Sequence, residues 1–114
     1  MKFNRFEEIM AWQKAKDLTV RVYSLFKESK DFEFKNQIQS ASISVMNNIA
    51  EGFERKSNNE FKHFLFIAKG SCGEIRSMLY LAKDLNKISD DDFKLLFAMS
   101  EEVSKMLSGL IKCL

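Results

Sequence analysis

The chain has 114 residues, which is enough for one domain with a substantial hydrophobic core, and we treat residues 1–114 as that single domain. Hydrophobic residues make up 46% and charged residues 30% of the chain, a balance typical of soluble globular proteins. The 18 basic and 16 acidic side chains give a net charge of +2, so charge alone does not mark a dedicated nucleic-acid binder.

The two cysteines, Cys72 and Cys113, are too far apart in the sequence to form a close-spaced metal-binding pair. Each falls on an apolar stripe of an expected helix, so we predict two buried free thiols. The N-terminal stretch MKFNRFEEIM carries acidic residues where the apolar part of a signal peptide would begin. No apolar run approaches the roughly 20 residues that a membrane span needs. These features favour a cytoplasmic protein without a membrane partner.

Helical periodicity dominates the sequence, and with no proline and only 4 glycines few residues interrupt it. The first helix is predicted to begin near Phe6–Glu8 and to end near Ser29. The second is predicted to run from Phe34 to Arg55. Both have apolar residues at four-three spacing, which defines a core seam. The seams are Ala11, Ala15, Leu18, Val22 and Leu25 in the first helix, and Phe34, Ile38, Ala41, Val45 and Asn48 in the second.

Serines are predicted to begin the last two helices. Ser57 followed by Glu60, and Ser89 followed by Asp92, fit the capping box, in which the serine oxygen accepts from a free amide and the acidic side chain reaches back. The core lines of these helices are Phe61, Leu65, Ala68, Cys72, Ile75, Leu79 and Ala82, and then Phe93, Leu96, Ser100, Val103, Leu107, Leu110 and Leu114.

Four amphipathic helices joined by short turns predict an all-α fold, an antiparallel up-down-up-down four-helix bundle. Further apolar residues flank the seams, and they favour self-association because one four-helix core would not bury all of them. The flanking residues are Ile9 and Trp12 in the first helix and Ile43, Met46, Ala50 and Phe53 in the second. Gly70, Gly73 and Ser77 also form a line of small residues, which we interpret as a place for close helix packing.

Several residue patterns were considered as catalytic or metal sites. Glu60 and His63 share a helical face, but a di-metal bundle needs a second such pair and the chain has one histidine. Ser71 and Cys72 lie within a helical pattern, without the glycine-rich elbow that presents a nucleophile. The glycines of GSCGE, residues 70–74, lack the lysine of a phosphate-binding loop. We therefore predict a protein that is not an enzyme and uses no metal or cofactor.

Basic residues gather around the predicted turn between the second and third helices. They are Arg55, Lys56, Lys62 and His63, with Lys69 further along. Such a cluster can hold phosphates by charge without reading bases. The alternative is an ordinary solvated corner. In an oligomer the same cluster would repeat, and multivalency would strengthen weak contacts.

Asn48-Ile49-Ala50-Glu51-Gly52 is followed by a second motif that runs from Ser57 to Glu74. Together they resemble the signature of the small bacterial four-helix-bundle proteins known as 23S rRNA intervening-sequence (S23) proteins. Trp12-Gln13-Lys14-Ala15, followed by Leu18 and Tyr23, resembles the first helix of the same family. We interpret the signature residues as structural, with Gly52 allowing close packing and Asn48 fixing helix register through a buried hydrogen bond. The signature consists of Asn48, Glu51, Gly52, Ser57, Glu60, Phe61, Gly70, Ser71 and Glu74.

The resemblance implies an up-down bundle that assembles into a homo-oligomer, a ring of five subunits, with no established catalytic activity. It also implies similarity to the accessory protein of diversity-generating retroelements, a basic pentamer that works with a reverse transcriptase and nucleic acid. The sequence departs from the family pattern at Gln39 and Ser40, where an arginine pair is usual, and at Met46, where proline is frequent. The first departure weakens the nucleic-acid hypothesis.

Two hypotheses follow from the sequence. The leading one is a non-enzymatic, oligomeric scaffold that binds nucleic acid, structured RNA in particular. The alternative is a protein-binding adaptor with no nucleic-acid role.

Overall fold

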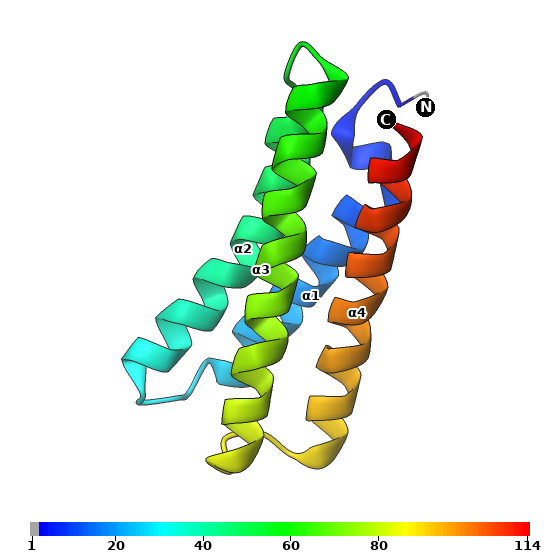
Figure 1. Cartoon of the computed structure of the whole chain (residues 1–114). Coiled ribbons are helices and arrows are strands. Elements are labelled where there is room, and N and C mark those ends of the chain that lie inside the picture. The colour runs from blue at the N-terminus through cyan, green and yellow to red at the C-terminus, as the bar shows by residue number, and fades with distance from the viewer. Residues whose placement is uncertain (1–2) are drawn as a thin grey trace.

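The computed structural model describes residues 3–114, which form a short 3₁₀-helix and four α-helices. The 3₁₀-helix η1 is Phe6–Glu8, and the α-helices are α1 (Met10–Phe26), α2 (Phe32–Phe53), α3 (Asn58–Asp84) and α4 (Asp90–Cys113). The connecting loops lie alternately at the two ends of the molecule, so consecutive helices run in opposite directions (Figure 1). The all-α bundle predicted from the sequence is confirmed, and it measures 43 × 22 × 19 Å.

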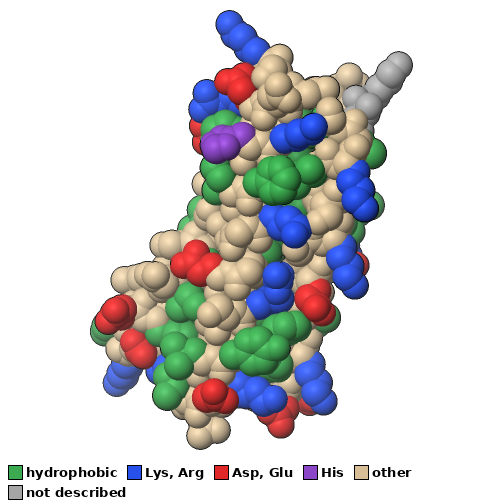
Figure 2. All heavy atoms as spheres, in the orientation of Figure 1, with side chains coloured by type: hydrophobic (Ala, Val, Ile, Leu, Met, Phe, Trp, Pro, Cys, Tyr) green, Lys and Arg blue, Asp and Glu red, His purple; other side chains and the backbone are tan. Residues whose placement is uncertain are grey.

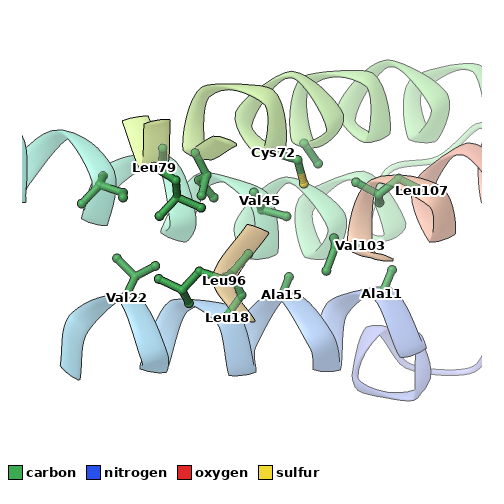
Figure 3. Packing of buried hydrophobic residues seen from close by; sticks show 14 of the residues in the cluster. Ala11, Ala15, Leu18, Val22, Val45, Cys72, Leu79, Leu96, Val103 and Leu107 are labelled. Carbon is green, nitrogen blue, oxygen red and sulfur yellow. The ribbon is translucent and has the colours of Figure 1, made fainter. Parts of the chain in front are cut away.

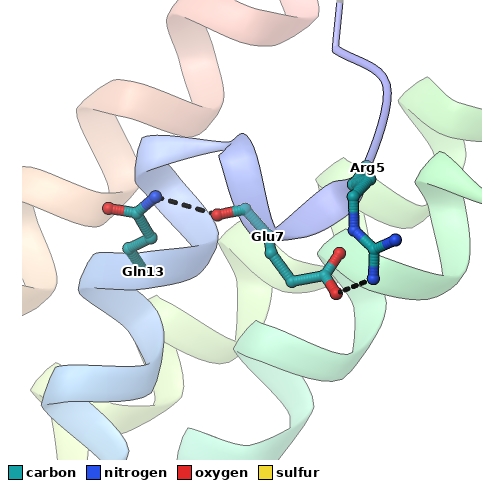
Figure 4. A network of polar contacts seen from close by, with 3 residues as sticks. All are labelled: Arg5, Glu7 and Gln13. Atoms are coloured by element: carbon teal, nitrogen blue, oxygen red, sulfur yellow. Dashed lines mark hydrogen bonds and ion pairs between the residues drawn. The ribbon is translucent and has the colours of Figure 1, made fainter.

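The start of the first helix differs from the prediction of one helix that runs from Phe6–Glu8 to Ser29. Ile9 has an extended backbone (φ −76°, ψ 118°) and separates η1 from α1, so the predicted helix is divided in two. At its other end, α1 stops at Phe26 and not at Ser29. The break folds η1 back along the bundle and buries Ile9, which is 1% exposed. The Gln13 side-chain amide donates to the Glu7 carbonyl (2.8 Å), and Arg5 pairs with the Glu7 carboxylate (2.8 Å), as Figure 4 shows. Ile9 is therefore a core residue rather than part of a surplus apolar flank.

Side chains cap the beginnings of α2, α3 and α4. Ser57 Oγ accepts from the Glu60 amide (3.2 Å) and Ser89 Oγ from the Asp92 amide (3.1 Å), which confirms both predicted caps. The Glu60 carboxylate accepts from the Ser57 hydroxyl (3.4 Å). Asp31 Oδ1 accepts from the Phe34 amide (3.2 Å), so α2 begins at Phe32 rather than at Phe34.

The Asp31 cap predicts a specific pH dependence of stability. The Phe34 amide and, after it, the Lys87 ammonium hold the pKa of Asp31 below its ordinary value of 3.8. A lowered folded-state pKa gives stability that is present above the unfolded pKa and lost as pH falls through the folded pKa. Asp31→Asn keeps a capping oxygen but cannot ionise. We expect wild type to be more stable than this variant at neutral pH, with the difference shrinking below about pH 4 in urea unfolding. A difference that is independent of pH would contradict this.

The core follows the predicted seams closely. Figure 3 shows inward-pointing side chains along all four helices, including Leu18 from α1, Val45 from α2, Leu79 from α3 and Leu107 from α4. All four are fully buried. Three helices depart from the predicted seams near one end. In α1 Phe26 is buried and Leu25 half-buried, in α2 Ile49 is fully buried and Asn48 half-buried, and in α4 Leu110 and Leu114 are half-buried.

The two cysteines have different environments. Cys72 is a buried free thiol, as predicted, and burial raises its pKa to about 11, which makes the reactive thiolate scarce. Cys113 is exposed, so the prediction of a second buried thiol is wrong. Six residues separate Cys113 from the buried Leu107, and at about 100° per residue this spacing turns Cys113 away from the core face.

Candidate nucleic-acid interface

The predicted basic corner is only partly available for a ligand. Arg55 extends its guanidinium to the Glu51 carboxylate (2.6 Å) and lies 4.8 Å from the centre of the Phe64 ring. The Arg55 guanidinium therefore already contacts a carboxylate of α2 and an aromatic ring of α3. This exposed pair contributes little to stability, but it gives the signature residue Glu51 a structural role.

The other corner residues divide between two surfaces. Lys56 is exposed in the α2–α3 turn and borders a hollow of about 140 Å³, together with Ser57 and Asn58. His63 is exposed and lies edge-on to Phe64, with the ring centres 5.4 Å apart. Lys62 and Lys69 are seven residues apart on α3, so they lie on one line of that helix. Arg55 and His63 thus both contact Phe64, Lys56 lies in the turn, and Lys62 and Lys69 line α3.

Lys62 and Lys69 belong to a longer row of residues, which we call the α3 basic stripe. Its aromatic members are well exposed, Phe66 by 58% and Tyr80 by 55%. In Figure 2, Lys and Arg side chains in blue alternate with green hydrophobic side chains down the front of the molecule, where α3 lies. The α3 basic stripe consists of Lys62, Phe66, Lys69, Gly73, Arg76, Tyr80 and Lys83.

The cations of the stripe have no ion-pair partners in the part of the chain that the structure describes. No carboxylate within residues 3–114 lies within 4.0 Å of the charged nitrogens of Lys62, Lys69, Arg76 or Lys83. At about 1.5 Å per residue the stripe is about 30 Å long. A row of four cations of this length, none of them in an ion pair, is suited to a polyanion.

Contacts with α4 fix the position of Arg76, in the C-terminal half of the stripe. Arg76 Nη1 donates to Ser100 Oγ (3.2 Å), and this buried hydroxyl in turn donates to the Cys72 carbonyl (3.1 Å). Arg76 also borders a shallow hollow of about 130 Å³ with Lys105 and Glu101 of α4. The guanidinium therefore has a fixed anchor beside a second cation and one carboxylate.

An aromatic cluster supports Tyr80. Its ring packs against Phe93 (5.5 Å between ring centres) and edge-on against Phe97 (5.3 Å). The Lys83 ammonium lies 4.9 Å from the centre of the Phe93 ring. Phe66 lies on α3 14 residues before Tyr80, and 58% of its surface is exposed to solvent.

Signature residues link α2 to α3. Asn48 Nδ2 donates to the carbonyl and the hydroxyl of Ser44 in its own helix (2.8 and 3.0 Å), and Ser71 Oγ donates to Ser44 Oγ (2.9 Å). The predicted role of Asn48 is therefore corrected: it is half-buried and orients Ser44, while the bond between the two helices is made by Ser71.

The glycines of the signature differ in their surroundings. A Cβ on Gly52 would lie 2.7 Å from Phe64 Cβ, so the predicted close packing at Gly52 is confirmed. A Cβ on Gly70 would meet nothing within 4 Å, and one on Gly73 would meet only the Arg76 guanidinium at 3.9 Å. Gly70 and Gly73 therefore do not serve close packing within the described chain.

The remaining signature residues, Phe61 and Glu74, and the two residues that depart from the family pattern, Gln39 and Ser40, range from buried to exposed. Phe61 packs edge-on against Phe53 (6.0 Å between ring centres), and Glu74 is exposed on α3. Gln39 is half-buried, and its carbonyl accepts from the Ser42 hydroxyl (2.8 Å), whereas Ser40 is exposed. α2 thus has Gln39 and Ser40 at the two positions where the family resemblance implies arginines.

The residues considered for catalysis from the sequence have structural surroundings. Glu60 caps α3, and Cys72 is buried beneath Arg76 and Ser100. Within residues 3–114, no three His, Cys, Asp or Glu side chains are grouped closely enough to hold a metal ion. None of the helices in the same range is both long enough and apolar enough to cross a membrane.

The fold and this surface define a small four-helix bundle whose most prominent external feature is a row of basic and aromatic side chains. The chain belongs to the 23S rRNA-intervening sequence protein family, whose model matches residues 7–109. It is similar to the crystal structure of a protein of unknown function from the S23 ribosomal protein family of Bacteroides thetaiotaomicron VPI-5482. That similarity has a TM-score of 0.85 and 26% identity and covers 90% of this chain and 99% of that one. No curated protein matches the chain.

Proposed function

We propose that this protein is a non-enzymatic, oligomeric scaffold that binds RNA through the α3 basic stripe, in the cytoplasm. The single observation that carries the proposal is the row of four cations without ion-pair partners, held along one helix about 30 Å in length. Phosphate contacts of this kind supply sequence-independent affinity. The family name, which refers to an insertion in ribosomal RNA, agrees with an RNA partner.

A fluorescence anisotropy titration tests the proposal. A labelled RNA hairpin with a single-stranded loop is expected to bind at low salt, and an unlabelled RNA of the same type to compete. Failure to bind RNA or DNA at about 20 mM salt would overturn the proposal, because electrostatic affinity is greatest there. That result would leave the protein-binding adaptor as the better account.

An exposed apolar patch supports the oligomeric part of the proposal. Phe32, Leu81 and Leu85 are each about half or more exposed. Figure 2 shows hydrophobic side chains gathered at the lower left, where α2 begins, toward the end of α3. Leu81 also borders a hollow of about 260 Å³ with Phe34 and Met78, and the rim of this hollow includes Asp31 and Glu33. Burying such side chains contributes about 1.5–3 kcal/mol each. We propose that a second copy of the chain covers this patch.

Leu81→Glu tests self-association, because it places a charge in the patch at a residue that is 48% exposed and outside the core. Wild type is expected to elute as an oligomer, a pentamer in the proposed assembly, in light scattering behind a sizing column. The variant is expected to be smaller with unchanged helix content. A wild-type monomer at micromolar concentration would contradict the proposal, as would an unchanged mass of the variant.

A further inference from the structure

The α3 basic stripe contains the same three-residue unit twice. In each unit an aromatic residue stands between two cations on one helical line, with a spacing of four and then three residues. The second unit begins 14 residues after the first. The units are Lys62, Phe66 and Lys69, and then Arg76, Tyr80 and Lys83.

Gly73 lies between the two units and leaves the middle of the stripe bare. A Cβ at this position would have open space around it, apart from the Arg76 guanidinium at 3.9 Å. Glycine allows a ligand to approach the helix backbone closely. The stripe thus has two exposed aromatic side chains, Phe66 and Tyr80, and between them Gly73, which has no side chain.

From this arrangement we infer that the stripe binds unpaired nucleotides, whose bases stack on Phe66 and Tyr80 while their phosphates contact the flanking cations. The inference rests on the proposed function and specifies its ligand as single-stranded nucleic acid. Bases in a duplex are stacked on one another and cannot reach a flat protein surface, whereas splayed bases stack on aromatic rings flanked by positive charge.

The dimensions fit an oligonucleotide. The two rings are 14 residues apart on α3, which corresponds to about 21 Å along the helix. At about 3.4 Å per stacked nucleotide this distance spans about six nucleotides. The whole stripe then covers about nine or ten nucleotides, within the range known for single-strand binding surfaces.

A second copy of the chain is a less suitable occupant of the stripe. If two copies met through the same face, the four cations of each would oppose one another without carboxylates to compensate them. The apolar patch at Phe32, Leu81 and Leu85 is better suited to self-association because its side chains are apolar and exposed. The two surfaces therefore suit different partners.

The test compares unstructured single strands of about twelve nucleotides, as RNA and as DNA, with duplexes of the same sequence. Full-length wild-type protein is expected to bind the single strands at least about tenfold more tightly than the duplexes at equal salt. Strands of about four nucleotides, too short to reach both rings, are expected to bind more weakly than the longer ones. The RNA and DNA arms show whether the 2′-hydroxyl contributes.

Phe66→Leu is the main variant, because it removes the ring from an exposed site but keeps an apolar side chain. It is expected to weaken single-strand binding about 5- to 100-fold while leaving duplex binding and the salt dependence unchanged. Tyr23→Leu is the matched control, since Tyr23 is 41% exposed and lies on α1, away from both the stripe and the apolar patch. Single strands containing 5-iodouridine are expected to crosslink to Phe66 or Tyr80 on irradiation.

The outcomes separate this inference from the proposed function. Equal binding of single strands and duplexes, or unchanged single-strand affinity in Phe66→Leu, would overturn the stacking inference but keep the RNA-binding function. No binding of either form would overturn both. A change of oligomeric mass in Phe66→Leu would show that the ring packs against a second copy and would likewise overturn the inference.

Discussion

Replacing Lys62, Lys69 and Lys83 together with glutamine is expected to lower the affinity for RNA about 100-fold at about 0.1 M salt. Each cation that contacts a phosphate releases about 0.7 of a counterion from a single strand, so each contact is worth about fivefold at this salt concentration. Stability should change little, because these three side chains have no ion-pair partners among residues 3–114. Anisotropy titrations measure the first effect and thermal melts the second.

A matched triple variant controls for net charge. Lys16, Arg21 and Lys27 are exposed on α1 or just after it, and their replacement with glutamine changes the net charge from +2 to −1, as the stripe variant does. The control variant is expected to retain most of the affinity. If both triple variants lost affinity equally, binding would depend on overall charge, and the α3 basic stripe would not be the interface.

Gly52→Ala is expected to destabilise the bundle by about 1–3 kcal/mol through overpacking. The new Cβ would lie 2.7 Å from Phe64 Cβ and 3.0 Å from Phe61 Cδ1, and neither of these atoms is the far end of a flexible chain. Alanine favours helix over glycine by about 1 kcal/mol, which offsets part of the cost. Urea unfolding should therefore show a lower midpoint than wild type.

Gly70→Ala is the matched control for that experiment, because both residues are helical glycines of the same signature. A Cβ at Gly70 meets nothing within 4 Å, so only the helix propensity changes. The variant is expected to gain about 0.5–1 kcal/mol. A loss of stability in Gly70→Ala, or none in Gly52→Ala, would contradict the packing described for α2 and α3.

The fold could be predicted because its determinants are local. The serine caps at Ser57 and Ser89 depend on residues three apart in the sequence, and the structure has the expected bonds. The seam of α3, and that of α1 as far as Val22, follow from helical periodicity alone. The all-α bundle therefore followed from the sequence without any knowledge of tertiary contacts.

The break at Ile9 could not be predicted in the same way. No glycine or proline marks it, and an apolar residue at this position is compatible with a continuous helix. The break depends on tertiary packing, which buries Ile9 and places Phe6 edge-on against Trp12 at 5.1 Å. The exposed position of Cys113 is different, because its spacing from Leu107 already turns it away from the core face and the apolar stripe was drawn too wide.

The candidate interface was found only in part from the sequence. The sequence analysis placed Arg55 and Lys62 in one basic cluster because they are close in the sequence. In the structure, however, Arg55 forms an ion pair with the Glu51 carboxylate, whereas Lys62 has no such partner among the described residues. The four-three spacing that links Lys62 to Lys83 was present in the sequence, but that periodicity was applied to the apolar core lines and not to the outer face. The ion-pair state and exposure of each side chain required the structure.

The dependence of RNA affinity on salt tests the central claim most directly. If the four cations of the stripe contact phosphates, the logarithm of the association constant should fall linearly with the logarithm of salt concentration, with a slope of about −3 for a single strand. The triple glutamine variant should reduce that slope to about −1. A wild-type slope near zero, or no binding at about 50 mM salt, would contradict the assignment of the α3 basic stripe as a nucleic-acid interface.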